Sequence, residues 1–432
     1  MKEKLLVLSM DAMVHEDVEY MLTKPHFSRI MKKCAKVEKV HGIYPSLTYP
    51  AHTSLMTGCY PGKHGIYNNT PFETHKDGIT HWYLYHKSIR TEDLFAAAKR
   101  AGCSTAAVYW PITGCNPNID HVINEYFFYY PDEDVPETFA GQGSDEVALQ
   151  AIRENMHRYP TNRGSQGSLL TSEFDDFIMG CTCSLIRNVQ PDVLLIHNCH
   201  LDTLRHRNGV FDPILKEGLD QMDKWLGEVI ETMEQAGVYD DTNFVILSDH
   251  GQLDVTRRIK INALLRQRGF LDIAPNGTLY DWQAYAQYNG MSASIYLRDP
   301  HNEALRAKVY DYLLQLEKEG TWGISKIYTV EEVRERYGTY GPFSFMVETD
   351  GSSSFTEEWT EPVIDHPFAK AMHGYAPEKG PQPIFLGHGP SFLEGATLHT
   401  AKLVDVAPTL ARILGQKMPQ AQGRCMEELL KT

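Results

Sequence analysis

Three short apolar runs stand out along the chain, and polar residues follow each of them closely. The runs cover residues 5–10, 193–197 and 244–248. Their length and their richness in Val, Ile and Leu are typical of strands that are buried on both faces. Amphipathic segments such as 91–101 and 218–237 lie between them and predict helices. The pattern therefore predicts an α/β fold: a doubly wound, mostly parallel sheet with helices on both faces.

The pattern changes after residue 255. Helices are predicted over 259–269 and 303–319, and strands over 292–297 and 343–348. We interpret residues 256–370 as a smaller α+β insertion, a cap or substrate subdomain within a metal-binding catalytic core of residues 1–255 and 371–432. A strand over 383–387 and a helix over 403–414 would return the chain to that core. An insertion placed between active-site segments commonly overhangs the site and selects the substrate.

Composition and charge restrict the partners. The chain has 432 residues and a formal net charge of −15, which disfavours binding to a nucleic-acid polymer or an anionic membrane surface. A small anionic substrate remains compatible, because metal ions can supply positive charge locally. The N-terminal apolar run is too short for a secretory signal, and no run of ~18 apolar residues could span a bilayer. The eight cysteines lack paired zinc-finger spacing and are expected to be reduced, so we expect a cytoplasmic protein.

Aspartates and histidines gather where the three apolar runs end. Asp11 directly follows the first run, Asp202 and His206 lie after the second, and Asp249 and His250 follow the third. Ligands of open parallel sheets bind at the carboxyl ends of the strands, so these side chains should lie close together. A single aspartate after a strand is more often a cap or turn residue. Three of them, joined by histidines, favour a site for zinc or a similar divalent ion.

A candidate nucleophile lies in residues 44–58. This segment predicts a loop, a helix with Thr48 at its N-cap, and a stop at Gly58. The free N–H groups and the positive dipole end at such a position favour an alkoxide and the anion that it attacks. From this segment alone, simple capping is the more common role. Metal ligands at the same sheet edge favour the nucleophile, because a threonine hydroxyl needs a metal or a base for activation.

Taken together, the motifs resemble those of the type I phosphodiesterase and nucleotide pyrophosphatase family of the alkaline phosphatase superfamily. Thr48-Tyr49-Pro50 resembles the family's nucleophile segment, and residues 58–66 resemble its Gly-x-x-Pro-x-x-His-Gly-Ile segment. This match places Asn69 where the family has a phosphate-binding asparagine. Residues 404–410 resemble the closing helix of the superfamily.

The resemblance implies a two-metal site, with zinc as the expected ion. The implied ligands are Asp11, Asp249, His250 and Thr48 for the first ion, and Asp202, His206 and His373 for the second. Asn69 and the N–H of Tyr49 would donate hydrogen bonds to a phosphate oxygen. The implied activity is hydrolysis of a phosphodiester or phosphoanhydride of a small molecule, with nucleotides among the candidates, through a phosphothreonine intermediate.

The last ligand of the second ion has two candidates. His373 lies in a His-Gly-Tyr segment that resembles the family motif, whereas His388 matches only by following a predicted strand, so we favour His373. Other histidines near the motifs are expected to be hydrogen-bonding groups: His41, His52, His64, His197 and His200. The chain departs from the family pattern at three places: Ala376-Pro377 replaces Asp-Asn, Arg205 replaces a glycine before His206, and Tyr49 stands where nucleotide-cleaving members often have Phe.

Other functions remain open at this point. A phosphonate (C–P) hydrolase or a phosphomonoesterase of the same superfamily would use a similar site. No arginine lies between Thr48 and Asn69. An amide there suits the single negative charge of a diester better than the double negative charge of a monoester. A sulfatase would need Cys or Ser in place of Thr48. A metal-stabilised binding module without turnover is the non-enzymatic alternative.

Overall fold

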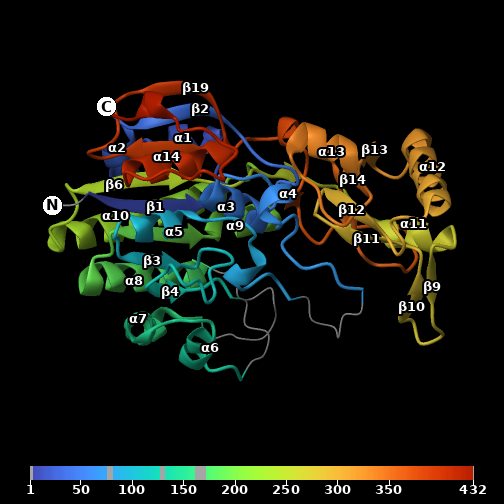
Figure 1. Cartoon of the computed structure of the whole chain (residues 1–432), viewed down its shortest axis with the longest axis horizontal. Helices are drawn as coiled ribbons and strands as arrows, with labels where there is room; N and C mark the ends of the chain where they lie inside the picture. Colours follow the sequence, from blue (N-terminus) through green and yellow to red (C-terminus); the bar gives the residue numbers. More distant parts are fainter. Residues whose placement is uncertain (1–2, 75–80, 127–131, 161–171, 432) are drawn as a thin grey trace.

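The computed structural model describes residues 3–74, 81–126, 132–160 and 172–431. An eight-stranded sheet with the strand order β19-β2-β18-β6-β1-β5-β3-β4 forms the larger lobe in Figure 1. All neighbouring strands are parallel except that β18 runs antiparallel to both β6 and β2. The predicted mostly parallel sheet is confirmed. Its strands are β1 (Lys4–Met10), β2 (Ala35–His41), β3 (Thr105–Val108), β4 (His121–Ile123), β5 (Val193–Asn198), β6 (Thr242–Leu247), β18 (Phe385–His388) and β19 (Thr397–Lys402).

Helices cover both faces of this sheet, and β1 shows why. Leu6 and Leu8 belong to one buried hydrophobic cluster, which includes residues of α8 (Ser172–Val189) and α10 (Leu215–Gln235). Leu5 and Val7 point to the opposite face, because successive side chains of a strand alternate. They belong to a second cluster, which includes residues of α3 (Thr48–Thr57), α5 (Leu94–Arg100) and α14 (Val406–Ile413). The predicted helices over 91–101, 218–237 and 403–414 therefore correspond to α5, α10 and α14.

Further helices complete the larger lobe. They are α1 (His15–Met21), α2 (Pro25–Met31), α4 (Pro61–His64), α6 (Val135–Gly141), α7 (Glu146–Asn155) and α9 (His200–Asn208), with short 3₁₀ turns at His86–Ser88, Met156–Arg158, Pro377–Lys379, Leu403–Asp405 and Glu427–Leu429. None of the helices in the described ranges is long and apolar enough to span a membrane.

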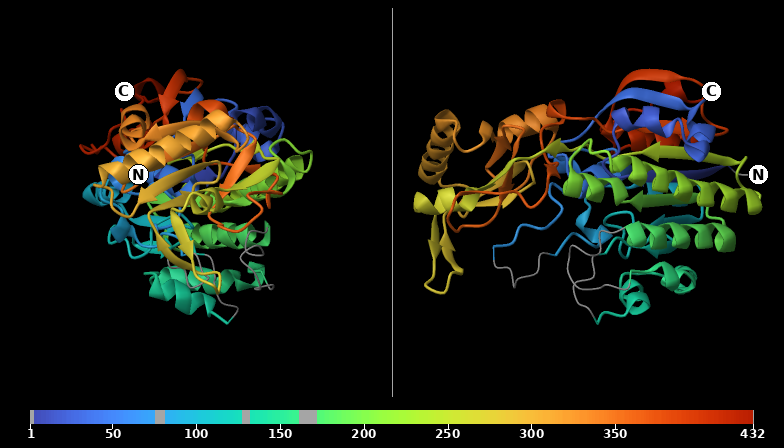
Figure 2. Two further views of the ribbon diagram at one scale, coloured as in Figure 1. Left: turned by 90° about the vertical axis from the view of Figure 1, so that its right-hand side faces the viewer. Right: turned by 180° about the vertical axis from the view of Figure 1, so that it is seen from behind.

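A second lobe, yellow to orange in Figures 1 and 2, stands at the end of the core opposite the start of β1. It has its own hydrophobic cluster, to which Ile259, Ile295, Leu313 and Val347 contribute. The helix predicted over 303–319 is α12 and the strand predicted over 292–297 is β12, whereas the boundaries at 256 and 370 stay a prediction. Its helices are α11 (Ile261–Gln267), α12 (Glu303–Glu319) and α13 (Val330–Tyr337). Strands β8 to β16 are Arg257–Lys260, Leu271–Ile273, Leu279–Trp282, Ala284–Tyr288, Ser292–Leu297, Ile324–Thr329, Phe345–Thr349, Ser353–Thr356 and Ile364–Asp365; β7 (Leu253–Asp254) pairs with β17 (Ala371–Met372).

The two lobes meet beside the carboxyl ends of the core strands. The amide of Met291 donates to the carbonyl of His373 at 2.9 Å, and Asn68 donates from its side chain to that of Asn289 at 2.6 Å. Gly374 makes this close approach possible, because it has a φ of +93° and a Cβ there would lie 1.6 Å from the carbonyl oxygen of Asn289. The position of His373 is therefore fixed by the contact between the lobes.

Candidate metal centre and active site

The predicted acidic edge forms where β1, β5 and β6 end. These strands are adjacent and in register, with Met10 opposite Asn198 and Ser9 opposite Leu247. Asp11 and Asp249 therefore leave the sheet at the same level, and the amide of Ala12 donates to Asp249 Oδ1 at 3.2 Å. Parallel register alone brings together residues that are more than 230 positions apart.

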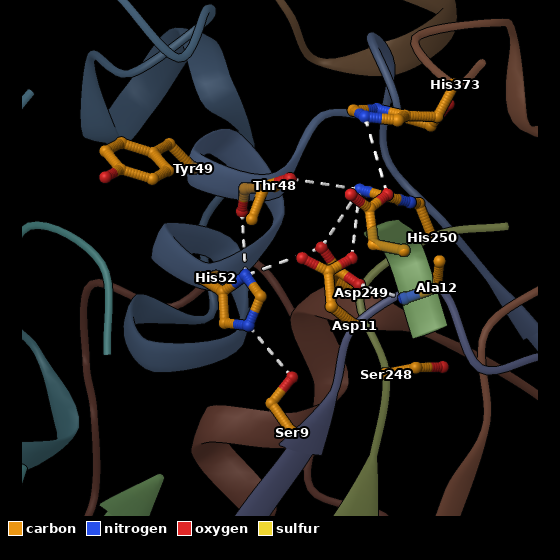
Figure 3. A network of polar contacts seen from close by, with 12 residues as sticks. Ser9, Asp11, Ala12, Thr48, Tyr49, His52, Ser248, Asp249, His250 and His373 are labelled. Carbon is orange, nitrogen blue, oxygen red and sulfur yellow. Dashed lines mark hydrogen bonds and ion pairs between the residues drawn. The ribbon is translucent and has the colours of Figure 1, made fainter. Parts of the chain in front are cut away.

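Thr48 lies at the start of α3, facing this edge (Figure 3). It is the first helical residue, and Leu47 occupies the N-cap with an extended backbone, so the predicted N-cap position was wrong by one residue. The physical reason is that the hydroxyl does not cap the helix. It lies 3.2 Å from His250 Nε2 instead. The predicted stop at Gly58 is confirmed, with a φ of +67°.

The first predicted ligand group is compact and buried. Ligand atoms of Asp11, Asp249 and His250 all lie within 4.8 Å of one another, and His250 Nε2 lies 3.1 Å from Asp249 Oδ2 and 3.5 Å from Asp11 Oδ1. Burial, with the nearby charge of Asp202, raises the pKa of Asp11 to about 7, and burial with the charge of Asp11 raises the pKa of Asp249 well above its usual range. Asp11 Oδ1 and Asp249 Oδ2 receive no hydrogen bond. Buried carboxylate oxygens without donors fit a bound cation.

The second predicted group surrounds Asp202. His206 Nε2 lies 3.2 Å from one carboxylate oxygen and His373 Nε2 lies 3.8 Å from the other. The opposite ring nitrogens are held by backbone carbonyls, His206 Nδ1 by Ala371 at 2.7 Å and His373 Nδ1 by Ser46 at 3.0 Å. Both Nε2 atoms are thereby left free to face Asp202, which is how metal-binding imidazoles are usually oriented. Burial opposes ionisation of Asp202, but the adjacent His206 holds its pKa below the usual range.

The two groups adjoin each other through a stacked pair of imidazoles. The rings of His250 and His373 lie 4.0 Å apart at 13°, and their ligand atoms form a further compact set with Asp202. His206 contacts Asp202 but is not part of that set. Gln252, which the sequence did not reveal, donates to Asp202 Oδ1 at 2.5 Å. The sequence signal that could have identified Gln252 is its position two residues after His250.

His388 lies elsewhere. Because β18 is antiparallel, the last residue of this strand is at the opposite edge of the sheet, and His388 is in register with Phe244 near the beginning of β6. The nearby charges that act on His388 are those of Glu394, Arg29 and Lys431. The geometry therefore places His373, and not His388, beside Asp202.

Asn69 and Tyr49 contact each other. The N–H of Tyr49 donates to Asn69 Oδ1 at 3.0 Å. The Tyr49 N–H is thus paired with the oxygen of Asn69 in this structure, and the contact of either group with a phosphate stays a prediction. The ring of Tyr49 is buried and packs edge-on against Trp82, with 4.9 Å between the centroids.

His52 lies behind Thr48, one helical turn along α3. Its Nδ1 contacts the carbonyl of Thr48 at 2.8 Å and its Nε2 contacts Ser9 Oγ at 2.8 Å (Figure 3). Since a carbonyl can only accept, Nδ1 carries the proton and Nε2 accepts from the hydroxyl. Burial, together with the charge of His197, lowers the pKa of His52 well below its usual range. A neutral His52 thus fixes the first turn of α3 on the end of β1.

The fold and this paired arrangement of carboxylates and imidazoles are those expected of a phosphoester-cleaving α/β enzyme. The family model described as type I phosphodiesterase / nucleotide pyrophosphatase matches residues 5–376, and the chain belongs to this family.

The similar proteins include ectonucleotide pyrophosphatases and a dinucleoside triphosphatase. Human ectonucleotide pyrophosphatase/phosphodiesterase family member 5 is 24% identical over 425 residues, which cover 96% of this chain and 74% of that protein. The bis(5'-adenosyl)-triphosphatase enpp4 of Xenopus laevis is also 24% identical, and the match covers 95% of this chain and 78% of the Xenopus protein. The solved structure of human family member 5 covers 100% of both chains with a TM-score of 0.70 and 20% identity. A murine family member 5 structure, an inactive threonine-to-alanine variant in complex with AMP, has a TM-score of 0.65 and 20% identity. These structures show the fold.

Proposed function

We propose that this protein hydrolyses a phosphodiester or phosphoanhydride bond of a small nucleotide-like substrate, with Thr48 as the nucleophile and two divalent ions, zinc above all, as cofactors. The observation that carries the proposal is the Thr48 hydroxyl at the start of α3, 3.2 Å from His250 and facing buried carboxylates. A relative named as a bis(5'-adenosyl)-triphosphatase and a similar structure in complex with AMP support the nucleotide class.

The side chains at the site fit divalent ions. Asp11, Asp249 and His250 would hold one ion beside Thr48, and the second would be held by Asp202, His206 and His373. The oxygens of Asp11 and Asp249 that lack donors support the first assignment, and the two imidazoles whose Nε2 atoms face Asp202 support the second. Ions bound there would lower the pKa of the Thr48 hydroxyl and neutralise charge on the phosphate oxygens.

The chain's own groups position the reaction. The Thr48 hydroxyl loses its proton to solvent, and its Oγ–P bond forms as the bond from phosphorus to the leaving oxygen breaks; the leaving group departs with the electron pair and takes up a proton from solvent. The side-chain nitrogen of Asn69 can donate to a nonbridging oxygen, because its oxygen is held by the N–H of Tyr49. Water then cleaves the Oγ–P bond of the phosphothreonine and restores the hydroxyl. His52 keeps the first turn of α3 in place throughout, since it bonds both Thr48 and Ser9.

The charges at the site support a diester over a monoester. Within the described ranges, Asp11, Asp202 and Asp249 form ion pairs only with histidines, and neither arginine nor lysine takes part. A phosphate monoester brings a second negative charge that a guanidinium would normally hold. The single charge of a diester needs less compensation.

A substrate panel tests this proposal. The chelated protein is reconstituted with zinc and assayed on bis(p-nitrophenyl) phosphate, diadenosine triphosphate, a nucleotide sugar, p-nitrophenyl phosphate and phosphonoacetate. We expect kcat/KM for a diester or anhydride to exceed that for the monoester and the phosphonate by at least about tenfold, equivalent to about 1.4 kcal/mol of transition-state stabilisation. A higher kcat/KM for the monoester or the phosphonate would overturn the assignment.

A further inference from the structure

Two aspartates of the first ligand group are held in the same way, by one carboxylate oxygen each. The amide of Ala12 donates to Asp249 Oδ1 at 3.2 Å, and His197 Nε2 lies 3.1 Å from Asp11 Oδ2. The opposite ring nitrogen of His197 faces the buried carboxylate of Glu125 at 3.7 Å. Within the described residues, the second oxygen of each aspartate receives no hydrogen bond. One oxygen therefore fixes the carboxylate, and the other is left for an ion.

Gln252 holds the third aspartate, Asp202, by one oxygen as well. Its side-chain nitrogen donates to Asp202 Oδ1 at 2.5 Å and to the backbone carbonyl of Asp202 at 3.1 Å. An ionised carboxylate and a carbonyl can only accept, so the nitrogen end of the amide must face Asp202, and both of its N–H groups are used. The other carboxylate oxygen, Asp202 Oδ2, faces His206 Nε2 at 3.2 Å.

We propose that Gln252 is a positioning residue for the second divalent ion: by occupying Oδ1, it makes Asp202 a ligand that binds through Oδ2 alone. The proposal rests on the proposed function, because it concerns the second ion of that site. Bonds of about 2.0–2.1 Å to zinc at tetrahedral angles separate two ligand atoms by roughly 3.3 Å. The 3.2 Å between Asp202 Oδ2 and His206 Nε2 is close to this value, whereas Oδ1 lies 3.8 Å from His373 Nε2.

The chemistry of an amide suits this position. Gln252 is completely buried, so water does not readily replace its hydrogen bonds. A lysine or arginine in its place would neutralise Asp202 and compete with the ion. A neutral amide holds the carboxylate and leaves its negative charge for the metal.

Gln252 is also a contact that a substitution can remove. The two imidazoles of the second group are held by backbone carbonyls, His206 by that of Ala371 and His373 by that of Ser46. A side-chain substitution leaves those carbonyls in place. The contribution of Gln252 can therefore be measured while both imidazoles keep their partners.

Zinc titration of the metal-free full chain tests the proposal without any substrate. Gln252→Met keeps the length of the side chain and removes the donor. We expect the affinity for the second ion to fall by about 10–100-fold, the usual effect of losing a partner of a metal ligand, and the affinity for the first ion to stay that of the parent. His206→Ala, which removes a ligand of the second ion, shows which of the two binding constants belongs to that ion.

Gln287→Met is the matched control. Gln287 is also buried, and its side-chain nitrogen donates to the carbonyls of Thr70 at 3.1 Å and Pro71 at 3.3 Å, with no predicted metal ligand among its partners. This variant should bind both ions as the parent does. A second-ion loss in Gln252→Met of less than about tenfold, an equal loss at both ions, or the same loss in Gln287→Met would overturn the proposal. So would a parent protein that binds a single ion.

A second measurement covers the case in which Gln252→Met does not fold. A crystal structure of the zinc-loaded parent protein should show Asp202 Oδ2 at about 2.0–2.2 Å from the second ion and Oδ1 on the Gln252 amide. Both oxygens on the ion, or an amide turned away from Asp202, would refute the proposal. Thr48→Ala should keep the second ion, and the titration involves no turnover, so failure of the phosphodiesterase proposal and failure of this one can be told apart.

Discussion

Replacement of Arg205 should destabilise the protein strongly, although this residue is not a ligand. Arg205 is completely buried on α9 between Asp202 and His206, and its guanidinium lies 2.5 Å from Asp17 Oδ2 and donates to the carbonyl of Val210. Asp17 is itself buried and also accepts the N–H of Val14 at 2.8 Å. The pair ties α9 to α1.

The magnitude follows from burial. Arg205→Met removes one partner and leaves the carboxylate of Asp17 without its counter-charge, which typically costs about 3–5 kcal/mol. The matched control is Arg153→Met on α7, because Arg153 pairs with Glu146 at 2.6 Å but the two side chains are 50% and 76% exposed. Such an exposed pair contributes about 0–1 kcal/mol. The two variants remove the same group and should differ by roughly 3 kcal/mol, equivalent to about a hundredfold in the unfolding equilibrium.

Urea unfolding of the metal-free proteins at one pH measures this difference, with hydrogen exchange of the α9 amides as a local probe. Because Asp17→Asn removes the buried charge, the double variant with Arg205→Met should recover much of the loss. Equal unfolding midpoints for Arg205→Met and Arg153→Met would refute the reasoning. So would a double variant that is less stable than Arg205→Met alone.

Three further predictions concern pH and metal. Burial lowers the pKa of His64 to about 3, so the free energy of unfolding should fall by about 1.4 kcal/mol per pH unit as the pH drops from about 6.5 toward 3. Urea titrations of His64→Gln should show a shallower pH dependence of this free energy, and a dependence as steep as that of the parent would contradict the prediction. Burial and the charge of Asp202 raise the pKa of Asp11 to about 7, so zinc binding near pH 6 should release protons, measurable by calorimetry in buffers of different ionisation enthalpy; heats independent of the buffer would argue against it. His373→Ala should lose one zinc equivalent by elemental analysis whereas His388→Ala should keep it, and the reverse result would exclude His373 as the ligand.

The sequence was informative where local patterns carry the structure. The apolar runs predicted the parallel strands, and the aspartates that follow them do converge, as Asp11 and Asp249 show. A short apolar run predicts a strand but not its direction, so the sequence could not show that β18 is antiparallel and carries His388 to the far edge. Glu125 reaches His197 only through the tertiary fold, and no local pattern marked it.

The sequence also could not show how buried charged residues are paired. Arg205 lies between the predicted ligands Asp202 and His206 and is of a residue type that is normally exposed. The sequence did not reveal that Asp17, 188 positions away, neutralises Arg205 inside the core. Thr48 was placed one residue too early relative to the helix, because its hydroxyl contacts His250 rather than a backbone N–H of α3.

The most direct test of the central claim is a rapid-quench experiment on the zinc-loaded protein with bis(p-nitrophenyl) phosphate. If Thr48 is the nucleophile, one p-nitrophenolate leaves in the first step, and acid quenching should trap a p-nitrophenylphosphoryl adduct that mass spectrometry locates on this residue. Thr48→Ala should fold and bind metal but show no adduct, and its turnover should fall by several orders of magnitude, because loss of the nucleophile removes several kcal/mol of transition-state stabilisation. Turnover by Thr48→Ala within about tenfold of the parent, a difference of only about 1.4 kcal/mol, would contradict the account.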